Sequence, residues 1–308
     1  MRGTKDRFRT AAALPLLILT ASCVPPAGTP APMPPPVASP APTPAPVPRP
    51  SAPVRSDFTF RGMPEQGGVL IGQVPGGTRT LMLDGKAVPV AADGSFLIAF
   101  DRDAETGQHL VATLADGRAV ERSLAVAAGS WRIEHINAPY RGSAASDAEF
   151  ERRRPAELAQ IAEARRTDHE SNGWRQQFRW PVTGRLSGFF GSQRVYQGKP
   201  GSYHGGTDVA VPAGTPFVAP ADGVVVLAAA APFTLEGNLL IVDHGMGLNS
   251  AFLHCQRLDV KVGDRVVQGQ RLGTVGRTGR ATGPHMHWGL KWRDARLDPG
   301  KLAGPMGN

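Results

Sequence analysis

The chain is 308 residues long, with 41% hydrophobic residues and a formal net charge of +8, which is enough length and apolar content for two ordinary domains. Two cysteines, Cys23 and Cys255, exclude a fold built on several disulfides. The positive charge would suit nucleic-acid binding, but no nucleic-acid-binding motif accompanies it, so we predict no nucleic-acid partner.

The first 23 residues have the layout of an export signal. Basic residues precede an apolar run at 11–19, which is too short to span a bilayer as a permanent helix. The run leads into Thr20-Ala-Ser-Cys23, which resembles a bacterial lipobox except that Thr20 stands where Leu is usual. We therefore expect export, followed either by membrane anchoring through a lipidated Cys23 or by ordinary signal cleavage.

Residues 24–56 are predicted to be a disordered linker. Positions 25–53 hold 14 of the 29 prolines of the chain, and Arg49 is their only charged residue. Such a segment cannot bury a core, and in an extended polyproline-like state it would reach up to roughly 90 Å at ~3.1 Å per residue.

Residues 57–138 have the pattern of short strands separated by turns. The dipeptide Asp-Gly, which favours tight turns between antiparallel strands, separates alternating apolar stretches. The dipeptides are at 84–85, 93–94 and 116–117, and the stretches are at 80–83, 95–98 and 110–113. We predict a small immunoglobulin-like β-sandwich, without a cluster of catalytic residues.

Residues 139–172 are predicted to be a helical connector. Pro155 suits a first helical position, and the residues that recur at helical spacing are Leu158, Ile161, Ala162 and Arg165. The basic run 152–154 is expected to be a solvated helix face.

Residues 173–308 return to a β pattern, with Gly or Pro every few residues. The predicted strands are 224–228, 239–242, 260–262, 266–272 and 286–290. His244, at a turn, is expected to be structural, and Cys255 is expected to be a small buried apolar residue.

Two pairs of side chains in this half have spacings that suit metal binding. His204 and Asp208 flank a Gly-Gly pair before an alternating apolar stretch, which favours a turn that enters a strand. His285 and His287 would project from the same face of a strand, with Met286 on the other face. Either pair taken alone is a weak signal, and the second is equally consistent with solvent-facing histidines.

Together with His254 these pairs define a resemblance. The stretch from about 178 to 299 resembles the LytM/lysostaphin-type (M23) zinc metallopeptidases, whose signatures are a His-x-x-x-Asp motif, a later Leu-His and a His-x-His motif. The chain carries them at 204–208, 253–254 and 285–287, and the tracts 212–216 and 263–270 resemble the family's framework. Phe252 occupies a position where the family commonly has Tyr.

The resemblance implies a fold class that is mainly β, with an antiparallel β-sheet metallopeptidase domain at 173–308 behind the β-sandwich and helix. By position it assigns one zinc ion per chain to His204, Asp208 and His287, and leaves His254 and His285 as a catalytic pair that does not bind the metal. Three protein ligands leave a fourth position for water, whose pKa zinc lowers to about 7.

A proton acceptor is also needed, and the chain has no His-Glu-x-x-His motif. We assign this work to His254 and His285 together, and which of them is the base stays open. The predicted enzyme is an exported zinc endopeptidase of the periplasm or cell envelope. In it, zinc-bound water attacks the scissile carbonyl of a peptide cross-link in bacterial peptidoglycan.

Two other functions remain open. The chain could be a catalytically inactive relative that activates a cell-wall amidase, and an amidase or a divisome protein is a possible partner. Such relatives typically lack a metal ligand, whereas all five residues are present here. It could also be a non-enzymatic wall-binding protein in which residues 57–138 make the contact. Peptidoglycan is the expected partner in each case.

Overall fold

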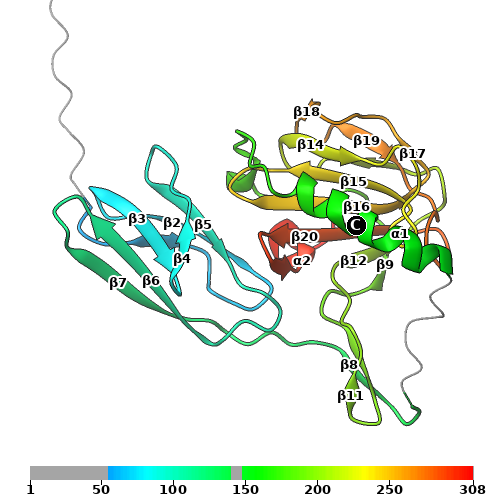
Figure 1. Cartoon of the computed structure of the whole chain (residues 1–308), viewed down its shortest axis with the longest axis horizontal. Coiled ribbons are helices and arrows are strands. Elements are labelled where there is room, and N and C mark those ends of the chain that lie inside the picture. The colour runs from blue at the N-terminus through cyan, green and yellow to red at the C-terminus, as the bar shows by residue number, and fades with distance from the viewer. Residues whose placement is uncertain (1–54, 140–147, 308) are drawn as a thin grey trace, which may run out of the picture. The chain divides into compact units, whose positions relative to one another are not determined.

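The computed structural model describes residues 55–139 and 148–307, and the structural statements below concern these residues. The predicted export signal, Cys23 and nearly all of the proline-rich linker lie outside them. The described residues belong to one compact unit, 52–308. The chain is mainly β, as predicted, and no helix of the described residues is long and apolar enough to cross a membrane (Figure 1).

The N-terminal half contains two antiparallel sheets. The first has the order β1-β2-β5, with strands Thr59–Arg61, Val69–Gln73 and Ser95–Ala99. The second has the order β4-β3-β6-β7, with strands Lys86–Val88, Thr78–Leu83, Gly107–Leu114 and Ala119–Ala125. The three predicted strands lie within β3, β5 and β6, and the φ angles of Asp84 and Gly85 are both positive, as a two-residue hairpin turn requires. An immunoglobulin-like arrangement of these strands stays a prediction.

These sheets pack against the C-terminal half. All five residues of β5 are buried, and one continuous apolar core includes Phe96 and Leu297. The buried Arg102 donates to the carbonyl of Gly191 and to Gln193 Oε1, at 3.1 and 3.0 Å. The predicted boundary at residue 138 stays a prediction, but the strand just before it pairs with the C-terminal half.

That strand, β8 (Ile133–Ile136), forms a small sheet with residues of the C-terminal half. The sheet has the order β11-β10-β8, where β10 is Gln193–Tyr196 and β11 is Lys199–Pro200. Its β8 and β10 strands run parallel, with Val195 opposite His135. The segment that leads to His204 is therefore tied to residues far away in the sequence.

An eight-stranded antiparallel sheet forms the centre of the C-terminal half. Its order is β18-β14-β15-β16-β20-β12-β9, and β21 also pairs with β20. The strands are β9 Arg185–Gly188, β12 Thr207–Ala210, β14 Gly223–Ala228, β15 Asn238–Asp243, β16 Leu248–Cys255, β18 Arg265–Val266, β20 Met286–Trp292 and β21 Ala295–Leu297. The core lies on one face, where Phe252, Met286 and Trp288 are fully buried.

Short elements complete this half. A three-stranded sheet has the order β13-β19-β17, with strands Pro216–Val218, Arg271–Thr274 and Arg257–Leu258. The short helices are η1 (Gly173–Arg175) and α2 (Pro299–Ala303). The predicted strand at 260–262 is wrong, because these residues lead into a turn and pair with no other strand. The predicted strand at 266–272 is two strands, β18 and β19, separated by a turn that contains Gly269 at φ 85°.

The helix α1 (Ala148–Ala164) lies across the opposite face of the large sheet, over β15 and β16 (Figure 1). Its Ile161 and Ala164 pack against apolar residues that include Leu253. Because Leu253 is directly opposite His287 in the β16–β20 pair, α1 lies on the sheet face that carries His287.

Two predictions about this helix are wrong. Pro155 lies inside α1 rather than at its start, because residues 148–154 extend the helix by two turns. Of the residues at helical spacing, Ile161 packs against apolar residues of the sheet, whereas Leu158 is 49% exposed. The basic run is not simply solvated, because Arg154 makes two hydrogen bonds to the carboxylate of Glu236, at 2.6 and 2.9 Å.

Candidate metal centre

Two adjacent strands position the first two candidate ligands. Asp208 in β12 is directly opposite His287 in β20, so both side chains project from the same face of the sheet. His204 precedes β12 and reaches the same point through Gly205 and Gly206. A Cβ atom on Gly206 would lie 2.6 Å from His287 Nε2 and 2.6 Å from the Trp288 carbonyl oxygen, so only glycine allows this close approach.

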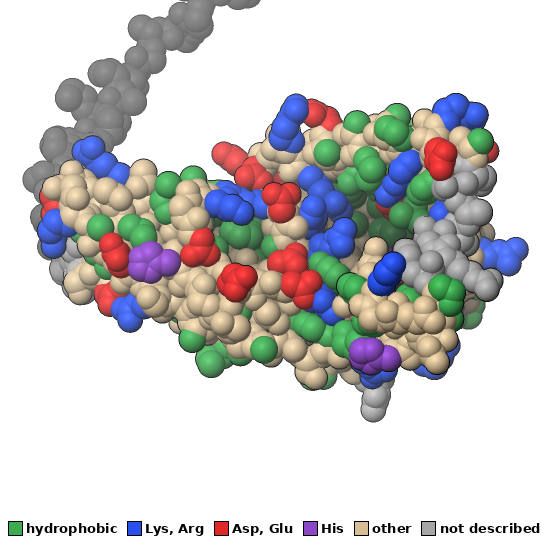
Figure 2. Space-filling model, turned by 60° about the horizontal axis from the view of Figure 1, so that its bottom comes forward, with side chains coloured by type: hydrophobic (Ala, Val, Ile, Leu, Met, Phe, Trp, Pro, Cys, Tyr) green, Lys and Arg blue, Asp and Glu red, His purple; other side chains and the backbone are tan. Residues whose placement is uncertain are grey.

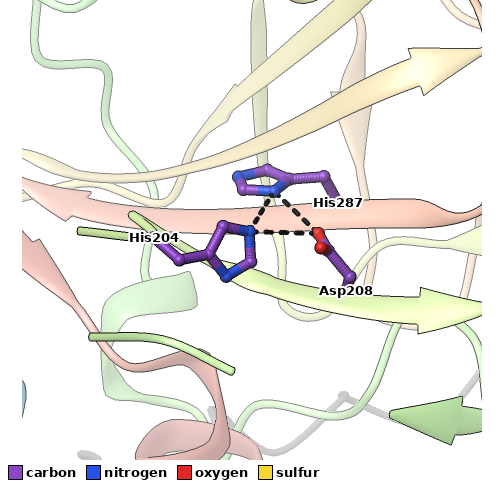
Figure 3. Close-up of side chains that lie close together, drawn as sticks. All are labelled: His204, Asp208 and His287. Atoms are coloured by element: carbon purple, nitrogen blue, oxygen red, sulfur yellow. Dashed lines mark hydrogen bonds and ion pairs between the residues drawn. The ribbon is translucent and has the colours of Figure 1, made fainter. Parts of the chain in front are cut away.

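The three side chains converge on one point (Figure 3). Asp208 Oδ1 lies 2.9 Å from His287 Nδ1 and 3.2 Å from His204 Nε2, and the two imidazole nitrogens are 3.1 Å apart. Their side chains are 15–26% exposed, so solvent reaches the cluster. The ring of His204 is oriented by its other nitrogen, Nδ1, which donates to the Phe189 carbonyl at 3.1 Å.

His254 reaches the cluster through an irregularity in its strand. Strict alternation along β16 would turn His254 towards the core with Phe252. The register between β15 and β16 shifts at Leu253 and His254, and His254 has a φ angle of +61°. Such a bulge re-aims a side chain, and the His254 ring is 4.9 Å from the His285 ring and 6.4 Å from the His287 ring, centroid to centroid.

His254 and His285 are held in the same way. His254 Nδ1 is 2.8 Å from the Thr278 carbonyl oxygen, and His285 Nδ1 is 2.9 Å from the Gly283 carbonyl oxygen. With both Nδ1 atoms donating, each Nε2 keeps a lone pair. His285 Nε2 is 3.8 Å from Asp208 Oδ1, so this histidine borders the cluster without joining it.

The ionisation of these groups suits a cation site. Burial by itself would raise the pKa of Asp208, but hydrogen bonds from His204 and His287 outweigh it and hold that pKa well below its usual range. Burial, followed by repulsion from neighbouring imidazoles, lowers the pKa of His254 to about 4 against its hydrogen bond to Thr278. At neutral pH, Asp208 is therefore an anion and His254 is neutral.

The donor set fits a tetrahedrally bound metal ion. Two imidazole nitrogens and a carboxylate oxygen are ligands that zinc takes in proteins. Ligand atoms about 2.0–2.2 Å from a tetrahedral ion are roughly 3.3–3.6 Å apart. The three donors here are 2.9–3.2 Å apart, so a small outward movement of the side chains brings them to this geometry.

Two supporting residues were missed at the level of sequence. A Cβ atom on Gly188 of β9 would lie 2.2 Å from Asp208 Oδ2, so this glycine makes room for the carboxylate. Arg102 holds the Gly191 carbonyl, while the N–H of Gly191 donates to the His204 carbonyl at 2.9 Å. Neither residue belongs to a motif of its own, so the sequence pattern carries no signal for them.

Three further residues that the sequence singles out are structural. His244, predicted to be so, is fully buried, with its two ring nitrogens 2.7 Å from the Asp222 carbonyl oxygen and 2.8 Å from Ser250 Oγ. Cys255 is a buried free thiol, as predicted, and burial raises its pKa to about 12. Phe252 packs on Phe217 and lies opposite Trp288, on the core face of the sheet rather than on the face of the cluster.

The chain is similar to known peptidases over the part that holds this cluster. Residues 202–299 match the model of peptidase family M23, and all five candidate residues lie in this range. The peptidoglycan DD-endopeptidases ShyA and ShyC of Vibrio cholerae are 39% and 47% identical, over 42% and 28% of this chain. These matches cover only 30% and 19% of the two relatives.

A solved structure is similar over a larger part of the chain. The crystal structure of a putative M23 peptidase from Pseudomonas aeruginosa has 32% sequence identity and a TM-score of 0.61. The match covers 79% of this chain and 96% of that one. The similarity therefore extends beyond the 98 residues between 202 and 299 that the family model matches.

We predict that Gly188→Ala lowers the affinity for Zn²⁺ by at least tenfold. The added methyl group would displace Asp208, and changes to residues that position a metal ligand typically lower metal affinity by about 10- to 100-fold. Gly107→Ala is the matched control, because Gly107 is also in a strand and a Cβ atom there meets nothing within 4 Å. Calorimetric titration of both variants with Zn²⁺ would contradict the role of Gly188 if their affinities were equal.

Proposed function

Because the chain belongs to peptidase family M23 and is a metallopeptidase, we propose that it is a zinc-dependent endopeptidase that hydrolyses peptide cross-links of bacterial peptidoglycan. One observation carries this proposal: the donor atoms of His204, Asp208 and His287 meet within about 3 Å of one another beside two further imidazoles. A purely structural zinc site would be closed by four protein ligands, whereas the described residues offer three at this point.

We propose that His204, Asp208 and His287 hold the zinc ion. When bound, zinc supplies Lewis acidity towards the scissile carbonyl and makes water a nucleophile at neutral pH. Asp208 contributes the negative charge of the ligand set, and the carbonyl of Phe189 keeps His204 in the tautomer that presents Nε2 to the ion.

His254 and His285 are proposed to handle the proton and the developing charge. Their Nδ1 atoms are committed to backbone carbonyls, so Nε2 of each is the atom that can accept a proton. A histidine that has accepted the proton becomes a cationic donor, which stabilises negative charge on the carbonyl oxygen in the transition state. We assign the two roles to the pair.

We also propose that the protein is exported and that Cys23 can anchor it to a membrane. The named activities of ShyA and ShyC are peptidoglycan cleavage, and peptidoglycan is a substrate of the cell envelope. Together with the export signal and the lipobox-like Cys23 of the sequence, this supports a periplasmic or envelope enzyme.

The proposed function is tested by digestion of purified peptidoglycan sacculi with the zinc-loaded full chain and mass spectrometry of the products. We expect cross-linked muropeptide dimers to be replaced by monomers, and a chelator to stop this change because it removes the ion. Release of whole peptide stems that requires both the chain and an added amidase would instead identify an activator.

The roles of ligand and proton acceptor separate in two variants. Asp208→Ala is expected to abolish both zinc binding and activity. His254→Asn, which tolerates the positive φ angle of this position, should retain zinc and reduce kcat by about 10²–10⁴. Metal content and kcat are measured on both proteins, and a His254→Asn protein without zinc would show that the ligand assignment is wrong.

Anchoring is tested by Cys23→Ser in the natural host. If Cys23 carries lipid, the wild-type chain sediments with membranes and the variant becomes soluble in the periplasmic fraction, because the acyl chains supply the membrane affinity. Identical fractionation of the two proteins would favour ordinary signal cleavage.

A further inference from the structure

The sheet face beside the metal centre continues along β20 towards two basic residues. Side chains of a strand alternate, so His287, position 289 and Lys291 share this face. Position 289 is glycine, and a Cβ atom there would already lie 3.5 Å from the Gly205 carbonyl oxygen and 3.7 Å from His287 Nε2. No side chain therefore separates Lys291 from the metal centre along this strand.

Arg296 lies next to Lys291. The two residues are directly opposite each other in the β20–β21 pair, so both side chains leave the same face. The guanidinium group of Arg296 also borders the loop of the metal ligands, because a Cβ atom on Gly205 would meet its Cδ, Nε and Cζ at 3.4, 3.7 and 4.0 Å.

A third cation comes from the end of α1, on the same face of the sheet. Arg165 follows the last residue of α1, and its Nε atom is buried without a hydrogen-bond partner among the described residues. Burial lowers the pKa of Lys291, and repulsion from Arg165 adds to this effect. Figure 2 shows Lys and Arg side chains gathered near the middle of the face in view, beside a hollow floored by hydrophobic side chains.

The described part of the chain offers these cations no carboxylate partner. No ion pair within 4.0 Å joins Lys291, Arg296 or Arg165 to a described Asp or Glu. Asp101 and Asp294 attract Lys291 from beyond ion-pair distance, and Asp101 Oδ2 accepts from the Arg296 backbone N–H at 2.8 Å. The Arg296 guanidinium lies 5.4 Å from the centroid of the Tyr203 ring, so its charge is not paired with a described carboxylate. Like charges directly opposite each other in a sheet are destabilising, so this arrangement has a cost that an anionic ligand would offset.

We propose that Lys291 and Arg296, assisted by Arg165, bind a carboxylate of the peptide substrate that lies a few residues from the bond that is cleaved. This inference rests on the proposed peptidase function and adds a specificity to it. Four strand residues separate Lys291 from His287 and span about 13 Å, and Arg296 lies nearer because it borders Gly205, so the carboxylate lies on the order of 10 Å from the metal centre. In an extended peptide this corresponds to roughly three residues from the scissile bond.

Two cross-linked peptides test the site. They are identical except that the carboxylate about three residues from the scissile bond is free in one and amidated in the other. The zinc-loaded full chain is expected to show about tenfold higher kcat/KM with the free carboxylate, expressed mainly in KM, because a charge-assisted contact is lost in the amide. Lys291→Gln and Arg296→Gln should each reduce this preference, because each removes one of the cations that contact the carboxylate.

Lys261→Gln is the matched control, because Lys261 is an exposed residue of a turn outside the large sheet. It should keep the full preference. Equal kcat/KM values for the two peptides with the wild-type chain, or an equal loss for both peptides in the Lys291 and Arg296 variants, would overturn the carboxylate site.

A binding measurement separates this inference from the proposed function. His254→Asn protein, which should bind substrate without turnover, is titrated with both peptides in a calorimeter. A tenfold difference in Kd between the two peptides supports the carboxylate site. If the wild-type chain binds with this difference but cleaves neither peptide, only the peptidase proposal is overturned. Equal Kd values overturn the carboxylate site even if both peptides are cleaved.

Discussion

The pairing of Asp208 with His287 across two central strands is the contact on which the candidate site depends. β12 and β20 bring these side chains opposite each other, and the approach of His204 through two glycines adds the third donor. A partly buried carboxylate is unfavourable unless it is paired and hydrogen-bonded. Here two imidazoles supply the hydrogen bonds to the carboxylate. A divalent cation bound between the three side chains would take the place of these hydrogen bonds and balance the negative charge.

Small deviations from regular strand geometry make that arrangement fit. Gly188 and Gly206 stand where a methyl group would collide with Asp208 and His287, and the bulge at His254 turns an imidazole from the core face to the metal face. A non-glycine residue with a positive φ angle costs of order 1–3 kcal/mol. The surrounding core, with Phe252, Met286 and Trp288 fully buried, holds the strands on either side and so sustains this strain.

Residues outside the large sheet hold the loops around the site. Arg154 of α1 binds the carboxylate of Glu236, whose backbone carbonyl accepts from the His254 N–H at 2.8 Å. Arg102 reaches the segment before His204 from the N-terminal half. The same sheet face carries the His204–Asp208–His287 cluster, the packed side of α1 and the cations Lys291 and Arg296, so the proposed metal site and the proposed carboxylate site share one surface.

The sequence by itself determined the fold class, the mainly β character and the identity of the residues that meet at the site, because ligand-type side chains and glycines occur in local motifs whose spacing is visible along the chain. It could not determine the start of α1, the ion pair of Arg154 or the break between β18 and β19, since these depend on packing partners distant in sequence. The direction of His254 is the clearest case: alternation in β16 points it to the core, and only the register with β15 introduces the bulge that reverses it. The need for glycine at 188 and the pairing of Lys291 with Arg296 were likewise decided by the tertiary structure, because each arises from a neighbouring strand rather than from the residue's own segment.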